Sequence, residues 1–144
     1  MDTPRRTGKP LESITMEQLA AALPSPEETM YMVGEQWATS FHAARGGNWQ
    51  LARHAANHVR KLLISFAALN PKHAERIDAF RPYVDEVLRA AHAADGPAFD
   101  RAFAAATNRA NADHAETGYA FIVWKAPETG RDTLVLQTPE RRPG

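Results

Sequence analysis

The sequence predicts an all-α protein in which four amphipathic helices form an antiparallel up-down-up-down bundle with an extended C-terminal tail. Apolar residues recur at spacings of three and four over four long stretches between residues 25 and 117, the pattern of helices that bury one face. The connections between these stretches are short and rich in glycine, asparagine and proline. A chain of 144 residues with 44% hydrophobic residues also has the size of one domain with one core.

An arm, residues 1–24, precedes the bundle and contains one short helical stretch at about residues 16–23. The first long helix is expected to begin after Ser25. Ser25 suits the capping position, Pro26 the first helical position and Glu28 the acidic position of a capping box. One face of this helix carries an apolar stripe of Met30, Val33, Trp37, Phe41 and Ala44.

The pair Gly46-Gly47 ends the first long helix, and Asn48 caps a second one that we expect over Trp49–Leu69. Only two or three residues separate these helices, which makes them antiparallel neighbours. The following Asn-Pro pair breaks the chain again. The stripe of the second helix consists of Leu51, Ala55, Leu62 and Phe66.

Two further helices complete the predicted bundle. The third is expected to kink or restart at Pro82 and to be closed by the Asp-Gly-Pro sequence at 95–97. The fourth is expected from about residue 98 to residue 117, with Gly118 as its C-terminal stop. The apolar positions of the third helix are Ile77, Phe80, Val84, Val87, Leu88 and Ala91, and those of the fourth are Phe99, Phe103, Ala106 and Ala110.

The segment after the fourth helix is rich in β-prone residues. FIVWKAP, at 121–127, is expected to run back over the end of the bundle, where TLVLQ, at 133–137, is placed to pair with it as a two-stranded ribbon. The predicted bundle domain therefore spans residues 25–127, and residues 128–144 form a tail.

Composition excludes several classes of function. Basic and acidic residues balance at 17 each, so no concentrated positive field for nucleic acid is visible. The chain has no cysteine, which excludes disulfides, thiolate metal sites and thioether-bound haem. No stretch has the length of a membrane span or the apolar core of a signal peptide, so we expect a cytoplasmic protein without a membrane partner. Hydrolase and kinase motifs are absent from the sequence, and whether the protein is an enzyme stays open.

Two segments resemble one known family. QWATSFHAARGGNWQLA, at 36–52, places a glycine turn and an Asn-Trp pair between two helices, and ANADHAETGYAFIVWKAP, at 110–127, ends the last helix. Together they resemble small bacterial c′-type four-helix cytochromes, with a Gly-Asn-Trp-x-Leu-Ala turn, a Cys-x-x-Cys-His sequence in the last helix and a Phe-Ile-Val-x-x-x-Pro exit. The resemblance covers about residues 27–127 and implies a c′-like bundle, which is often a homodimer.

This chain departs from that family at its defining chemistry. In register, Ala110 and Asp113 occupy the two cysteine positions and His114 the position of the axial histidine. The resemblance therefore implies a haem site without covalent attachment. In the second helix, the family has Tyr and Glu where this chain has His54 and His58.

Four polar residues are expected on inner helix faces. Asp113 continues the apolar stripe of the last helix, and His114 lies next to it. A buried carboxylate costs several kcal/mol unless it is paired or ligated. His58 is expected within the stripe of the second helix, with His54 one turn earlier, a spacing used for metal binding on helices.

Three hypotheses follow for these residues. In the first, Asp113 forms an ion pair with Arg109, Arg53 or a histidine, and the protein is a cofactor-free interaction module. In the second, the bundle interior binds a small ligand or a non-covalent haem b with His114 as axial ligand. The residues assigned to that binding site are His114, Asp113, Ala110, His58 and Trp37.

In the third hypothesis, a first-row divalent metal lies between the second and fourth helices. Its ligands would be His54, His58, Asp113 and His114, with His42 or Glu35 completing the set. All three hypotheses share the expected homodimer.

Overall fold

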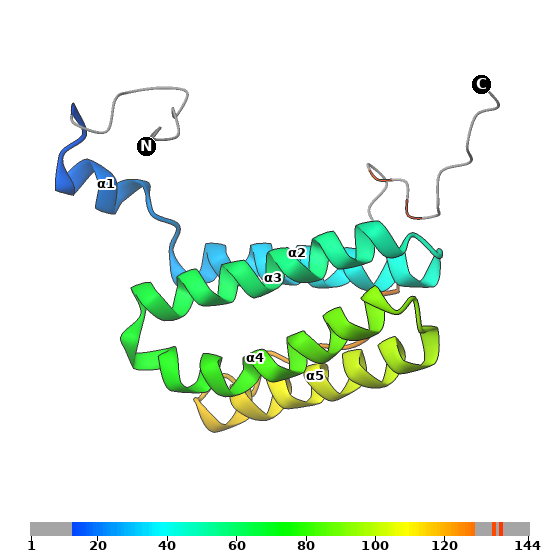
Figure 1. The fold of residues 1–144 in the computed structure, drawn as a ribbon. Helices are drawn as coiled ribbons and strands as arrows, with labels where there is room; N and C mark the ends of the chain where they lie inside the picture. The colour runs from blue at the N-terminus through cyan, green and yellow to red at the C-terminus, as the bar shows by residue number, and fades with distance from the viewer. Residues whose placement is uncertain (1–12, 129–133, 135, 137–144) are drawn as a thin grey trace, which may run out of the picture.

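The computed structural model describes residues 13–128 together with Leu134 and Leu136. The described residues are all-α, as the sequence predicts, and form one short and four long helices (Figure 1). No helix among them is long and apolar enough to cross a bilayer. The helices are α1 (Met16–Ala22), α2 (Pro26–Arg45), α3 (Trp49–Leu69), α4 (Pro71–His92) and α5 (Gly96–Glu116).

The helix starts follow the capping residues of the sequence. Ser25 Oγ accepts a hydrogen bond from the Glu28 amide at 3.1 Å, and Asn48 Oδ1 accepts one from the Leu51 amide at 3.2 Å. Each bond satisfies an amide that has no partner within the helix. Gly47 between the two helices has φ +76°, a left-handed conformation that suits glycine. The predicted starts of α2 and α3 are confirmed.

Two expectations, a restart of the third helix at Pro82 and its closure by residues 95–97, are wrong. α4 runs without interruption through Pro82, whose side chain lies on the exposed surface of the helix. A proline ring on the solvent side costs one helical hydrogen bond but displaces no core packing. Asp95 begins α5 instead of closing α4, because its Oδ1 accepts a hydrogen bond from the Ala98 amide at 3.0 Å. α5 therefore starts two residues earlier than expected, at Gly96.

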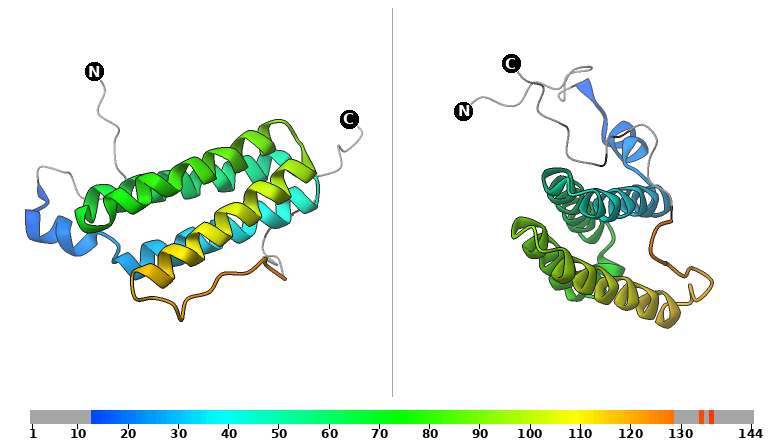
Figure 2. Two further views of the ribbon diagram at one scale, coloured as in Figure 1. Left: turned by 90° about the horizontal axis from the view of Figure 1, so that it is seen from below. Right: turned by 90° about the vertical axis from the view of Figure 1, so that its right-hand side faces the viewer.

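The four long helices lie in two layers, α2 beside α3 and α4 beside α5 (Figure 2). Each consecutive pair packs closely, whereas α2 and α5 meet at far fewer residues. Small side chains allow the close approach, since no larger group separates the backbones. The buried alanines are Ala43, Ala52, Ala55, Ala56, Ala90, Ala91 and Ala106. The backbones are thus close at three seams of the bundle and farther apart at the fourth, between α2 and α5.

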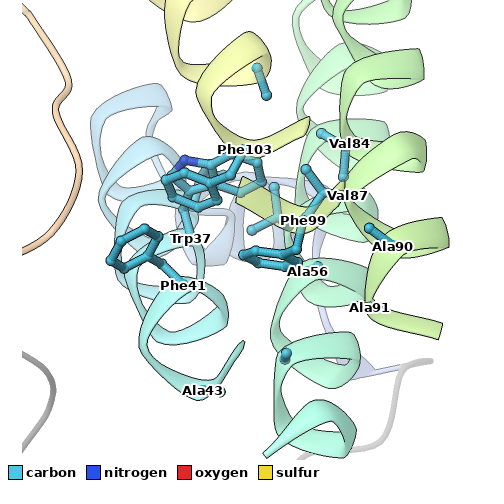
Figure 3. Packing of buried hydrophobic residues seen from close by; sticks show 14 of the residues in the cluster. Trp37, Phe41, Ala43, Ala56, Val84, Val87, Ala90, Ala91, Phe99 and Phe103 are labelled. Atoms are coloured by element: carbon cyan, nitrogen blue, oxygen red, sulfur yellow. The ribbon is translucent and has the colours of Figure 1, made fainter. Parts of the chain in front are cut away.

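Aromatic side chains fill the end of the bundle near the α2–α3 turn (Figure 3). Trp37 of α2 stacks on Phe103 of α5 with ring centroids 4.3 Å apart, and Phe41 lies 5.0 Å from the same ring. Phe99 continues the stack, 5.9 Å from Phe103. Burial of such rings supplies about 1.5–3 kcal/mol each, so this end contributes strongly to the stability of the core.

A glycine turn ends α5 and redirects the chain. Gly118 has φ +90°, and the Tyr119 amide donates a hydrogen bond to the His114 carbonyl at 2.7 Å, a Schellman arrangement. Gly118 is therefore the helix stop that the sequence predicts. The following residues, 119–124, are called the strap below. In Figure 2 the chain after α5 passes along the side between α5 and α2.

The strap region contains no β-strand. Residues 121–127 are extended coil without ladder pairing, so the expected two-stranded ribbon is wrong for this half. Its other half, 133–137, lies outside the described residues apart from Leu134 and Leu136. The backbone of Trp124 in this segment forms hydrogen bonds with the side chain of Asn111 on α5.

Candidate functional site: an apolar cavity beneath the strap

A cavity of about 370 Å³, partly open to solvent, lies among the four long helices on the side where α2 and α5 are apart. This volume is within the range of small-molecule sites, roughly 300–1,000 Å³. All four long helices and the strap contribute to its walls. The apolar lining is Met30, Val33, Trp37, Val59, Leu63, Phe66, Ile77, Phe80, Ala110, Ile122 and Trp124.

The cavity begins where the aromatic stack ends. Trp37 belongs to both, because it stacks on Phe103 and also lines the cavity. Two turns beyond Phe103 on α5, at the start of the lining, the side chain is only the methyl group of Ala110. On α5, large rings therefore fill the interior at one end of the bundle, and a methyl group leaves space toward the other.

The strap is fixed to α5 by one side chain. Asn111 Nδ2 donates a hydrogen bond to the Trp124 carbonyl at 2.9 Å, and the Trp124 amide donates to Asn111 Oδ1 at 2.7 Å. An asparagine side chain here replaces the backbone of a neighbouring strand. The Trp124 ring then lies over the gap, about 4.0 Å from the point where a Cβ on Gly34 of α2 would stand.

A network of charges borders the cavity between α4 and α5. Arg76 Nη1 lies 3.4 Å from Asp113 Oδ1 and 2.8 Å from Glu116 Oε2, and Arg109 Nε lies 3.3 Å from Asp113 Oδ1. Asp113 is the least exposed of the four side chains, at 15%. The hydrogen bond and the charge of Arg76 lower the pKa of Glu116, and the hydrogen bond from Glu116 raises the pKa of Arg76.

Two imidazoles line the same cavity. His114 of α5 lies 6.3 Å from the Trp124 ring, and His73 of α4 lies 5.9 Å from the Phe66 ring, between centroids. His114 Nδ1 is buried without a hydrogen-bond partner among the described residues. The same holds for the indole Nε1 of Trp37. Buried nitrogen atoms without partners are uncommon in folded proteins and often mark functional positions.

The structure brings together four of the residues assigned from the sequence. Trp37, Ala110, Asp113 and His114 all line the cavity. The sequence suggests the ion pair between Asp113 and Arg109 but not the one between Asp113 and Arg76.

His54 and His58 lie elsewhere. Both are exposed on α3, with ring centroids 6.4 Å apart, and neither lines the cavity. The expectation that His58 belongs to the inner stripe is wrong, because Ala52, Ala55 and Val59 form the buried face instead. Within residues 13–128 no three His, Asp or Glu side chains are grouped as metal ligands would be. The four residues of the metal hypothesis therefore do not meet.

Sequence reasoning missed three contributors to the site. Arg76 and His73 precede the first apolar residue of the third helix, so the stripe gave no reason to place them at the interior. The hydrogen bonds of Asn111 depend on the path of the strap, and no local sequence pattern predicts that path. The helical period does hold a signal for Arg76, which lies one turn before Phe80.

Comparisons with known proteins give no match: no family model, no curated protein and no solved structure is similar to this chain. The likeness to c′-type cytochromes remains a prediction from the two motifs.

Proposed function

We propose that this protein binds a small, largely apolar ligand in the cavity beside Ala110 and His114, on an up-down-up-down antiparallel bundle of the c′ type. The cavity itself carries the proposal. Closely packed interiors contain few spaces larger than a water molecule, and apolar side chains that remain in contact with water forgo the free energy of burial. A space of about 370 Å³ with apolar walls, partly open to solvent, therefore leaves apolar surface uncovered unless a ligand fills it.

The origin of the lining residues supports the antiparallel arrangement. On α2 and α4 they come from the N-terminal half of the helix, at residues 26–37 and 73–80. On α3 and α5 they come from the C-terminal half, at residues 59–66 and 110–117. Helices that alternate in direction bring these four halves to the same end of a bundle.

Haem b is the prosthetic group that the resemblance to c′-type cytochromes suggests. His114 supports it, since an imidazole in an apolar cavity is the kind of ligand that haem iron takes. The fit is partial. A porphyrin is a larger body than the cavity, and the Trp124 ring lies next to His114, so the strap would have to move outward. The residues present fit a smaller ligand better.

Calorimetric titration tests the proposal. The full chain is titrated with small uncharged aromatic and alicyclic compounds, and haemin is followed by its absorption spectrum. We expect at least one small compound to bind at one site per chain, and Ala110→Leu to abolish that binding by filling the space. Ala112→Leu, on the exposed side of the same helix, is the matched control. The proposal would be refuted if the folded wild-type chain bound none of these compounds. It would also be refuted if Ala110→Leu and Ala112→Leu, both folded, bound them equally well.

A second candidate is a cofactor-free interaction module. The ion pairs of Asp113 with Arg76 and Arg109 favour it, because they satisfy that carboxylate without any ligand. The open space next to Ala110 speaks against it. The module would act as the predicted homodimer, and sedimentation equilibrium measures whether the chain is a dimer or a monomer in solution.

A further inference from the structure

The cavity has one movable wall. The helices that form the other walls are held by close packing. The strap is held by a helix stop at one end and, at Trp124, by the two hydrogen bonds of Asn111 and by the half-buried indole, which packs against the core. Between these points the strap is exposed to water, with Phe121 80% and Val123 70% accessible. Few buried contacts and exposed backbone are the features of segments that open locally.

The chemistry of the walls restricts what the cavity accepts. The interior surface is mostly hydrocarbon and aromatic rings. Arg76 is the only guanidinium among the lining residues of the described chain, and it is paired with Asp113 and Glu116, while Asp113 and Glu27 add carboxylates to the walls. An anionic ligand would have to lose water and also displace a carboxylate from Arg76, which disfavours binding. An uncharged ligand meets neither cost.

Size adds a second restriction. A cavity of about 370 Å³ that the strap covers on one side holds a compact molecule of one or two rings. Trp37 at the inner wall and Trp124 at the strap supply aromatic surfaces that favour stacking on such rings.

We infer that the ligand is a compact, uncharged aromatic molecule, and that it enters and leaves by displacement of the strap at residues 119–124, with Asn111 as the latch. This inference rests on the proposed function of the cavity. Opening requires the two hydrogen bonds between Asn111 and Trp124 to break, and Gly118 is the pivot because its backbone conformation tolerates change. The latch controls the rates of exchange more than the affinity, since it is re-formed in the bound state.

Nitrobenzene is a suitable probe, because it is uncharged and quenches tryptophan fluorescence. Its matched anion is 4-nitrobenzoate. We expect nitrobenzene to bind to the full chain at neutral pH and 4-nitrobenzoate to bind at least tenfold more weakly. Equal affinity for the two would overturn the assignment of an uncharged ligand.

The latch is tested by stopped-flow quenching with nitrobenzene. Asn111→Ala should raise both the association and the dissociation rate by about tenfold, the effect of losing two hydrogen bonds, and change the dissociation constant less than threefold. The control is Asn108→Ala, an exposed asparagine one turn earlier on α5, which should leave both rates unchanged.

The outcomes separate the two proposals. If nitrobenzene binds and Asn111→Ala exchanges it at the rate of Asn108→Ala, the gate is wrong and the binding cavity stands. If neither nitrobenzene nor any other compound binds to the wild-type chain, the proposed function fails and the gate with it. Should Asn111→Ala unfold, Asn111→Asp, which keeps the acceptor for the Trp124 amide, replaces it with a smaller expected increase in rate.

Discussion

Asn111 and Trp124 form a side-chain-to-backbone pair that closes the bundle where α2 and α5 are apart. Both polar groups of the Asn111 amide are used, at 2.9 Å and 2.7 Å, so the pair resembles one rung of a β-ladder. It holds a tryptophan over an apolar cavity that the helices alone leave open.

The pair predicts a local difference in hydrogen exchange. The Trp124 amide should exchange slowly, because its hydrogen bond to Asn111 must open first. In Asn111→Ala this protection should fall by about tenfold or more. Amides in the middle of α3 should be unaffected, and Asn108→Ala should behave as wild type. Equal exchange at Trp124 in both variants would show that the pair does not hold the strap in solution.

Asp113 is expected to stabilise the fold because it forms ion pairs with both Arg76 and Arg109. Asp113→Asn removes the charge that faces Arg76 and Arg109 at a position only 15% exposed, which should lower the free energy of unfolding by about 1–2 kcal/mol. Urea denaturation measures it. Asp78→Asn is the control, since Asp78 is 62% exposed and makes one i,i+3 pair with Arg81; its loss should cost less than about 0.5 kcal/mol. Equal losses would contradict this role of Asp113.

The helices were predictable because their signals are local. Ser25 and Asn48 show the helix starts, and the Asn70-Pro71 pair shows where α3 ends, so the bounds Trp49–Leu69 follow without tertiary information. Pro82 misled because a proline inside a helix, although it costs about 3 kcal/mol, does not end a helix whose other residues are well packed. The role of Asp95 was predicted wrongly because an aspartate between two helices can follow the first or cap the second. Its side chain, which accepts a hydrogen bond from the Ala98 amide, shows that it caps the second.

The site was half predictable for a related reason. Asp113 and His114 were found because a polar residue that continues an apolar stripe stands out in the sequence. His58 failed the same test. In the sequence, His58 lies between Ala55 and Leu62 at helical spacing and was therefore assigned to the same face. In the structure Val59 is buried beside Ala55, and His58 is exposed. The pairing of Asn111 with the strap has no local signal, because it joins a helix to coil.

Ala110 offers a test of the cavity that needs no ligand. Ala110→Leu places apolar atoms in open space beside His114 and should raise the free energy of unfolding by about 1 kcal/mol. Ala112→Leu, on the exposed face, should change it by less than about 0.5 kcal/mol. Thermal and urea denaturation measure both. A loss of more than about 1 kcal/mol in Ala110→Leu would mean that this position is already closely packed.

Glu116 predicts part of the acid sensitivity of the fold. Its hydrogen bond with Arg76 lowers its pKa below the ordinary 4.5, so the folded state favours the ionised carboxylate. The stabilisation is complete above pH 4.5 and is lost as the pH falls through the lowered value. Wild type should therefore exceed Glu116→Gln in melting temperature at about pH 6, and the difference should shrink toward about pH 3. Glu75→Gln, with an exposed glutamate on α4, is the control. A difference that grows on acidification would contradict the sign of the shift.

His114 decides the haem proposal. If the bundle takes up haem b, ferric haem should give a Soret band with the wild-type chain, and His114→Ala should lose the band because the imidazole on the α5 wall is gone. Two further variants separate the candidate ligands. His73→Ala removes the other imidazole that lines the cavity, and His92→Ala removes an exposed one outside it. Loss in His73→Ala with retention in His114→Ala would move the axial ligand to α4. The Trp124 ring of the strap lies next to His114, so Asn111→Ala should bind haem faster than wild type. If the wild-type chain gives no Soret band at any haem concentration, haem is excluded and the smaller ligand is left as the occupant.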